Sequence, residues 1–92
     1  MYQVKVAEEA AKFIRKQDKR IQYQIINSIR VLAQNPRPQG CKKLQGYKEL
    51  YRIRSGNYRI VYTIREKKLL VFIVRVVHRK DIYRRLGKEG HD

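Results

Sequence analysis

The sequence predicts an α+β fold in which a helical hairpin packs on one face of a small, mainly antiparallel β-sheet. The two longest stretches with helical periodicity lie before Pro36, and a series of strand-like segments follows from Tyr51. Helices that precede a meander of strands are typical of the α+β class. The expected element order is β-α-α-β-β-β-α, in a single domain over residues 1–92 with a frayed tail at residues 87–92.

The N-terminal part predicts one strand followed by two helices. Residues 2–6 alternate between polar and apolar side chains, and residues 7–16 place apolar side chains at helical spacing. Asp18 is expected to cap the second helix, because a short acidic side chain accepts hydrogen bonds from the free N–H groups of a first turn. Pro36 ends this helix. Its apolar stripe consists of Ile21, Ile25, Ile29 and Leu32.

A β-hairpin is predicted from Tyr51 to Tyr62, which reads YRIRSGNYRIVY. Its turn is expected at Ser55-Gly56-Asn57, because these residue types favour turns. Successive side chains of a strand point to opposite faces, so the tyrosines and isoleucines share the core face. The other face then carries Arg52, Arg54 and Arg59. We expect that face to be open and to bind a polyanion, because buried guanidinium groups need partners.

The remaining segments complete the sheet. Residues 35–46 are typical of a linker, with Leu44 as its anchor in the core. Residues 69–77 are almost continuously apolar, which is typical of a central strand covered on both faces. The one charge of this strand, Arg75, needs a partner or the open face. A last short helix is expected over residues 81–86.

The positive charge of the chain is large and unevenly distributed. There are 23 Lys and Arg residues against 8 Asp and Glu, a net charge of +15, and residues 42–85 alone carry +11. Such a field attracts nucleic acid, an acidic membrane surface or an acidic protein. A merely solvated basic surface would explain scattered lysines, but it explains arginines grouped at strand positions poorly.

Several classes of function are disfavoured by composition. The sequence has no apolar run long enough to cross a membrane, and we expect no signal peptide in residues 1–10. The single Cys41 is expected to be a free thiol in a reducing cytosol, and hence the protein to be cytoplasmic. With 8 acidic residues and no cluster of metal ligands, we expect neither a metal nor another cofactor.

The groups that remain suit metal-free cleavage of RNA. In that reaction the 2′-hydroxyl attacks the adjacent phosphate, a base removes its proton, cations stabilise the phosphorane and an acid protonates the leaving 5′-oxygen. Arginine grips phosphate with paired hydrogen bonds, histidine exchanges protons near neutral pH, and tyrosine stacks on unpaired bases. Each residue also has a structural interpretation: His78 and Tyr83 as packing residues, and Arg79 and Lys80 as surface charge.

Two runs of the sequence, LYRIRSGNYRIVYTI and LLVFIVRVVHRKDIYRRL, resemble the RelE/ParE superfamily of toxin–antitoxin toxins, and the RelE branch most closely. A third similarity lies in residues 42–46, KKLQG. The resemblance covers nearly the whole chain and implies the same β-α-α-β-β-β-α fold. It also implies the activity of an mRNA interferase, a metal-independent endoribonuclease that enters the ribosomal A site and cuts the message there.

The resemblance further implies roles for individual residues. Arg52 and Arg54 would contact and activate the RNA, and Arg59 would stabilise the phosphate. Arg79 would assist the leaving group, and Tyr83 would stack on the substrate nucleotide. The cations expected to bind RNA around them are Lys42, Lys43, Arg75, Lys80 and Arg84.

One departure from the family concerns proton transfer. Its best-known members carry lysines on the first hairpin strand, where this chain has Arg52 and Arg54. Arginine stays protonated and is a poor general base. We therefore expect His78 to take part in proton transfer, and we count it among the catalytic residues.

The implied partners are a cognate antitoxin with acidic and apolar segments, the ribosome and mRNA, and operator DNA only through the antitoxin complex. No membrane partner is expected. Two other functions remain open: a ParE-like inhibitor that poisons DNA gyrase, and a non-catalytic RNA-binding module. The first would lead to broken DNA rather than lost translation, and the second would bind RNA with a steep salt dependence and leave it intact.

Overall fold

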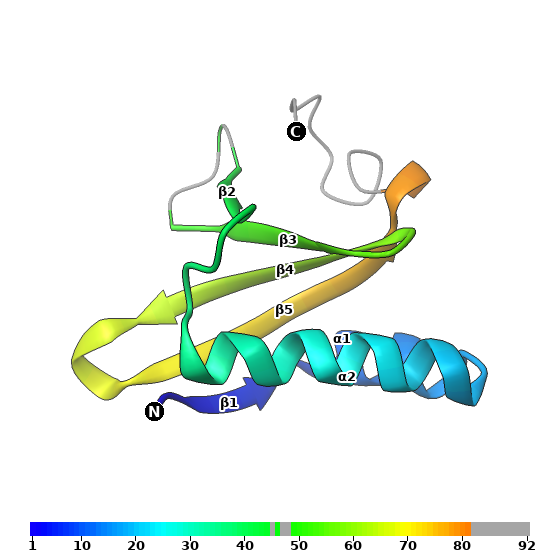
Figure 1. Ribbon diagram of the computed structural model, residues 1–92, viewed down its shortest axis with the longest axis horizontal. Coiled ribbons are helices and arrows are strands. Elements are labelled where there is room, and N and C mark those ends of the chain that lie inside the picture. The colour runs from blue at the N-terminus through cyan, green and yellow to red at the C-terminus, as the bar shows by residue number, and fades with distance from the viewer. Residues whose placement is uncertain (45, 47–48, 82–92) are drawn as a thin grey trace.

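The structure, a computed structural model, describes residues 1–44, 46 and 49–81. Two helices and a five-stranded sheet make up this part of the chain (Figure 1). The elements in chain order are β1 (Gln3–Val6), α1 (Glu8–Arg15), α2 (Lys19–Gln34), β2 (Lys42–Lys43), β3 (Tyr51–Ser55), β4 (Tyr58–Arg65) and β5 (Leu70–His78). Short 3-10 turns follow β4 (Glu66–Lys68) and β5 (Arg79–Asp81). The last helix expected at residues 81–86 lies outside the described residues, apart from Asp81.

Both helices lie where the sequence predicts them. α1 has Glu8 and Glu9 in its first turn, where acidic side chains interact favourably with the helix dipole. The carboxylate of Asp18 accepts a hydrogen bond from the backbone N–H of Ile21 at 3.0 Å, which confirms the predicted cap of α2. α2 ends two residues before Pro36. Neither described helix combines the length and the apolar character that crossing a membrane requires.

The sheet has the strand order β1-β5-β4-β3-β2, with β1 parallel to β5 and the other pairs antiparallel. Figure 1 shows β1 and β2 at its two edges. The predicted α+β class and the mainly antiparallel sheet are confirmed. β2, at Lys42–Lys43, lies within the segment predicted to be a loop. A strand of two residues is too short to leave an alternating pattern in the sequence.

The main core lies between the helices and one face of the sheet. Ile53, Ile60 and Tyr62 of the hairpin point into it, as their alternation predicts. They pack in one cluster with Ile25 and Leu32 of the predicted α2 stripe. Burying one large aliphatic side chain contributes about 1.5–3 kcal/mol to folding. The helical hairpin therefore holds the β3–β4 hairpin from one side only.

The opposite face of the sheet carries a second, smaller apolar cluster. The expectation that arginines alone occupy this face is wrong. Leu44 is 5% exposed and anchors the linker here rather than in the main core. The cluster consists of Leu44, Val61 and Val77, with Leu50 and Val74 packed against them.

β4 and β5 contain one irregularity in their pairing. Tyr62 pairs with Ile73, whereas the preceding Val61 pairs with Arg75, so β5 has one extra residue at this point. Such a bulge reverses the alternation of side chains beyond it. Val76 therefore enters the main core together with Ile73, although an odd number of positions separates them.

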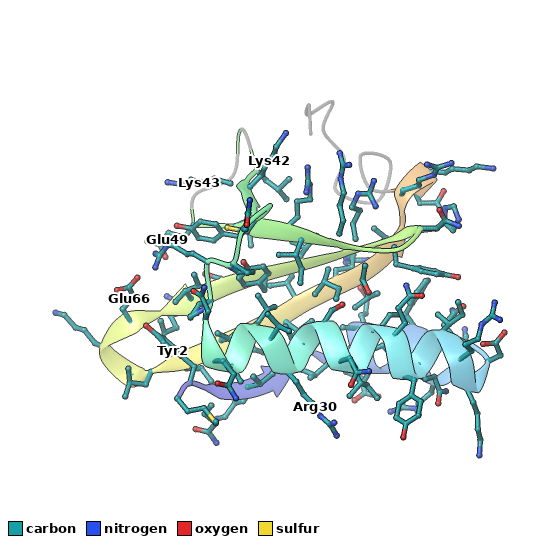
Figure 2. All side chains as sticks on the ribbon, in the orientation of Figure 1. Tyr2, Arg30, Lys42, Lys43, Glu49 and Glu66 are labelled. Carbon is teal, nitrogen blue, oxygen red and sulfur yellow. The ribbon has the colours of Figure 1, made fainter. Side chains whose placement is uncertain are left out.

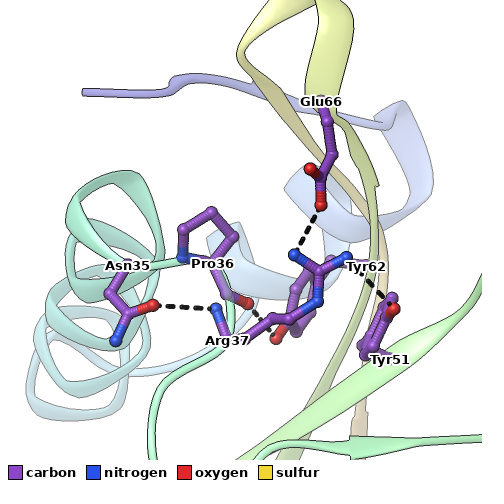
Figure 3. Close-up of polar contacts among 6 residues, drawn as sticks. All are labelled: Asn35, Pro36, Arg37, Tyr51, Tyr62 and Glu66. Atoms are coloured by element: carbon purple, nitrogen blue, oxygen red, sulfur yellow. Dashed lines mark hydrogen bonds and ion pairs between the residues drawn. The ribbon is translucent and has the colours of Figure 1, made fainter.

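Polar contacts tie the linker after α2 to the start of β3 and the end of β4 (Figure 3). The hydroxyl of Tyr62 donates a hydrogen bond to the carbonyl of Pro36 at 2.6 Å. Arg37 donates to the hydroxyl of Tyr51 at 3.3 Å and forms an ion pair with Glu66 at 2.5 Å. Burial raises the pKa of the Tyr62 phenol. Hydrogen bonds to Tyr51 and Glu66 raise the pKa of Arg37.

Candidate functional site

Three arginines of the hairpin lie on the sheet face opposite the helices, as the alternation predicts. Arg54 and Arg59 are directly opposite each other, and Arg52 lies opposite Val61 of the second apolar cluster. Directly opposed residues of a strand pair project from the same face. Lys42 of β2 lies opposite Arg52 and adds a fourth cation. We call the surface formed by these four cations the arginine face.

The arginine face is less open than the sequence suggests. Arg54 is exposed, but Arg52 is only 1% exposed and Arg59 only 7%. The expectation that all three project into water is therefore wrong for two of them. Arg52 lies opposite Val61 and Arg59 lies opposite Val77, so both arginines are next to members of the second apolar cluster. A guanidinium shielded from water interacts more strongly with a phosphate, because screening there is weak.

The hairpin turn holds the guanidinium of Arg59 and lies beside a further cationic residue, Arg79. The guanidinium of Arg59 donates hydrogen bonds from Nη1 to the carbonyls of Gly56 at 3.4 Å and Tyr58 at 3.2 Å. The backbone N–H of Arg79 donates to the carbonyl of Asn57 at 2.7 Å. Arg79, which is exposed, therefore lies beside the turn that joins the strands of Arg54 and Arg59.

His78 lies on the helix side of the sheet, not on the arginine face. It is directly opposite Tyr58, and the two rings meet edge to face with their centroids 5.4 Å apart. Tyr58 in turn contacts Phe13 of α1 at 5.9 Å. The Nδ1 atom of His78 accepts a hydrogen bond from the backbone N–H of Lys80 at 3.2 Å. The bulge in β5 is the cause, since strict alternation from Ile73 would place His78 with the arginines.

The other cations predicted to bind RNA are spread over the surface. Arg75 forms an ion pair of 2.6 Å with Glu9 of α1, which supplies the partner that the sequence required for it. Lys43 is exposed at the β2 edge beside Lys42 of the arginine face (Figure 2), and Lys80 is exposed in the turn after β5. Two predicted site residues lie outside the described residues: Tyr83 and Arg84.

A cavity of about 640 Å³ opens at the other end of the hairpin from the turn. Arg37, Tyr51 and Glu66 line it, so it coincides with the contacts shown in Figure 3. Because the register places Arg54 and Arg59 next to the turn, this cavity is separate from the arginine face. Over the described ranges, no three His, Cys, Asp or Glu side chains gather closely enough to hold a metal ion.

Sequence reasoning missed a polar contact between α2 and the end of β3, next to the hairpin turn. Gln24 and Ser28 of α2 contact Ser55, the last residue of β3. The available signal is their spacing: they are four positions apart on α2, directly before Ile25 and Ile29 of the apolar stripe. A polar pair in that place lies at the border of the buried helix face and can reach the sheet.

Comparisons with known proteins agree with this fold. The family model for the ParE toxin of the parDE type II toxin–antitoxin system matches residues 4–83. A protein of Escherichia coli that carries the name of a RelE-like toxin is 36% identical over 86 residues, which cover 89% of this chain and 90% of that protein. Toxin RelE3 of Methanocaldococcus jannaschii is 48% identical over 42 residues, 46% of either chain.

Solved structures give the same result. The structure of the intact E. coli RelBE toxin–antitoxin complex superposes with a TM-score of 0.73 at 30% identity and covers 85% of this chain and 96% of the matched chain. The structure of the isolated E. coli RelE toxin superposes with a TM-score of 0.73 at 26% sequence identity. The match covers 94% of this chain and 99% of the RelE chain. The structure of the archaeal RelE–RelB complex from Pyrococcus horikoshii superposes with a TM-score of 0.74 at 26% sequence identity. The match covers 85% of this chain and 94% of the matched chain.

Proposed function

The chain belongs to the RelE/ParE superfamily of toxins from type II toxin–antitoxin systems, and we propose that it stops translation by cutting mRNA in the ribosomal A site. The observation that carries this proposal is the arginine face. Arg52, Arg54 and Arg59 share one face of the β3–β4 hairpin, and Arg79 lies beside its turn. Arginine binds phosphate through paired, charge-assisted hydrogen bonds, so an RNA phosphodiester is the ligand that suits this group of arginines best.

In the proposed reaction the 2′-hydroxyl of the RNA attacks the adjacent phosphorus, and the bond to the 5′-oxygen of the next nucleotide breaks. The 2′-hydroxyl loses a proton to a base, and the leaving oxygen gains one. Arg59, held against the turn by the carbonyls of Gly56 and Tyr58, stabilises the negative charge that builds on the phosphorane. Arg54 and Arg79 orient the strand, and Arg79 assists the leaving group.

The path of β5 decides whether His78 can take part in the proton transfer. A direct role for His78 requires its imidazole to reach the phosphodiester that the arginines hold. Its ring lies against Tyr58 on the helix side of the sheet, which argues against direct transfer. The arginines are poor bases because they stay protonated. A proton acceptor supplied by the nucleotide, by water or by the ribosome accounts for the reaction without His78.

The partner proposed for the free toxin is a cognate antitoxin. Similar solved structures include complexes of RelE with RelB from E. coli and from P. horikoshii. A net charge of +15 favours a partner with acidic segments, and the exposed apolar residues Val6, Ile26 and Val31 favour one that also has apolar segments. We propose that the toxin acts in the cytoplasm, on the ribosome and mRNA, and reaches operator DNA only as part of the antitoxin complex.

One observation favours a second function. The family model that matches residues 4–83 is that of the ParE toxin, and a ParE-like toxin would poison DNA gyrase instead of cutting RNA. Such an inhibitor needs no set of arginines around a phosphodiester, so the arginine face favours the RNA reaction.

The deciding experiment uses purified chain, programmed ribosomes and primer extension across the A-site codon. The wild type is expected to cut within that codon, and Arg59→Ala to lose the cut. Arg30→Ala is the matched control, because it removes an equally charged side chain from the exposed surface of α2 (Figure 2). An intact message with a folded wild-type protein would reject the RNA reaction, and a DNA supercoiling assay with gyrase would follow.

A further inference from the structure

We propose that Gln24 and Ser28 of α2 are positioning residues for the arginine face. They hold the β3–β4 turn, and through it they fix Arg54 and Arg59 of that face together with the neighbouring Arg79. The catalytic consequence rests on the proposed function, whereas the positioning of the turn does not.

The contact between helix and turn is made of short, specific hydrogen bonds. The amide Nε2 of Gln24 donates to the carbonyl of Ser55 at 2.7 Å. The hydroxyl of Ser28 lies 2.8 Å from the hydroxyl of Ser55. Ser55 is 4% exposed, and both helix residues are half-buried. Hydrogen bonds in such a place are hard to replace with water, so their loss leaves polar atoms unsatisfied.

The hydroxyl groups of Ser28 and Ser55 also share a partner, the backbone carbonyl of Gln24. The backbone carbonyl of Gln24 accepts from the hydroxyl of Ser28 at 3.2 Å, and it lies 3.4 Å from the hydroxyl of Ser55. Gln24 therefore offers both an amide donor and a carbonyl acceptor to the same residue of the turn. This two-point contact fixes the orientation of Ser55 as well as its distance from α2.

Ser55, at the end of β3, and the two turn residues that follow it each connect to a different part of the site. Ser55 follows Arg54 directly and is held by α2. The carbonyl of Gly56 accepts from the guanidinium of Arg59 at 3.4 Å. The carbonyl of Asn57 accepts from the backbone of Arg79 at 2.7 Å. Movement of the turn away from α2 would therefore displace three arginines together.

Gly56 gives an independent sign that the turn is pressed against Gln24. Its φ of +62° lies in the left-handed region, and a Cβ atom there would come within 2.4 Å of Nε2 of Gln24. The close approach is possible only because glycine has no side chain. Gln24 is thus in contact with two successive residues of the turn, although 31 positions separate it from Ser55.

The test compares two glutamines of the same helix. Gln24→Glu keeps the size of the side chain but removes the amide donor. Gln22→Glu makes the same change in charge two positions earlier, where Nε2 instead contacts carbonyls of the helical hairpin at Ile14, Arg15 and Gln17. Both variants lose hydrogen bonds and gain one negative charge, and only Gln24→Glu disturbs the turn.

On programmed ribosomes, we expect Gln24→Glu to lower the cleavage rate at saturating ribosome concentration by about 10- to 100-fold, because small displacements of catalytic groups cost that much. The ribosome concentration that gives half of the maximal rate should change little in Gln24→Glu. Gln22→Glu should cut mRNA at the wild-type rate. Ser28→Thr keeps the hydroxyl and should retain more activity than Ser28→Ala. Equal rates for Gln24→Glu and Gln22→Glu would overturn the positioning role.

Heteronuclear NMR of the free chain tests the positioning without the reaction. The backbone signals of Ser55 and Asn57 and the side-chain Nε–H signals of Arg54 and Arg59 are expected to shift or broaden in Gln24→Glu and to stay unchanged in Gln22→Glu. Unchanged signals in both variants would overturn the inference. A wild type that leaves mRNA intact while these signals respond to Gln24→Glu would reject the proposed function and support the positioning of the turn.

Discussion

Arg54 and Arg59 face each other directly across the β3–β4 pair, at the end of the hairpin next to its turn. Directly opposed like charges disfavour strand pairing. Here they concentrate two guanidinium groups at one point of the sheet, one of them exposed and the other almost completely buried. A phosphate placed between them would interact with both.

Replacing Arg54 should weaken RNA binding in a salt-dependent way. Arg54 is exposed, so Arg54→Gln should fold normally while removing about one phosphate contact. The slope of log affinity against log salt for a short single-stranded RNA should fall by roughly one. Fluorescence anisotropy at several salt concentrations measures this slope, with Arg30→Gln as the control for loss of charge elsewhere. An identical slope for the two variants would remove Arg54 from the RNA contact.

The side of the sheet on which His78 lies leads to a prediction about pH. If His78 were the general base, its removal would cost about 10²–10⁴-fold in rate. Because its ring lies against Tyr58 on the helix side, we expect His78→Gln to cut at nearly the wild-type rate with an unchanged pH profile between about pH 5 and 8. Single-turnover cleavage at several pH values measures this. A rate loss in that range, together with a changed profile, would restore His78 to the site.

Tyr62→Phe should destabilise the fold without touching the arginine face. The variant loses the hydrogen bond of 2.6 Å to Pro36 and leaves that carbonyl without its donor, at a cost of about 1–3 kcal/mol in the free energy of unfolding. Urea denaturation near neutral pH measures the difference. Tyr23→Phe is the control, since Tyr23 is exposed on α2 and its hydroxyl should contribute almost nothing.

The same phenol should make the protein sensitive to alkali. Burial raises the pKa of Tyr62, so the folded state favours the neutral form. This contribution is fully present below the unfolded-state pKa of about 10 and is lost as the pH rises above it. Unfolding curves of the wild type should therefore show a loss of stability above about pH 10 that is smaller in Tyr62→Phe. Parallel curves for the two proteins would contradict the assignment to Tyr62.

Two glycines allow strain to be separated from contact. Gly56 and Gly40 both have positive φ, +62° and +92°, but only Gly56 would bring an added Cβ against a neighbour, Gln24. Gly40→Ala should lower the free energy of unfolding by about 1 kcal/mol, through backbone strain alone. Gly56→Ala should cost more, because the Gln24–Ser55 hydrogen bond is also lost. Thermal and urea unfolding of both variants measure the two losses of stability. Equal losses would mean that the Gln24 side chain moves away from the added methyl group without loss of stability.

Local patterns predicted the elements and the faces of the hairpin, because both depend on residues close in the sequence. The alternation of Tyr51, Ile53 and Tyr62 with arginines identified the core face, and Asp18 identified the start of α2. The two-residue strand at Lys42–Lys43 left no such pattern.

Features that depend on distant residues could not be predicted in this way. Arg52 is 1% exposed, and alternation could not predict this, because it tells which face of the sheet a side chain is on but not what covers that face. The bulge after Val61 reversed the side on which His78 lies, and nothing in the residues 69–77 marks its position. Ser55 meets its partners on α2 only in the folded chain.

The parallel pairing of β1 with β5 has a consequence for synthesis. Gln3 pairs with Leu70, 67 positions later, and β5 also pairs with β4. Pairings between distant residues form late and slowly, because a long loop must close first. A growing chain therefore leaves both β1 and β4 without their shared partner until the ribosome has made β5. A chain truncated before β5 should therefore fail to form the sheet and be inactive, because neither β1 nor β4 can pair with β5.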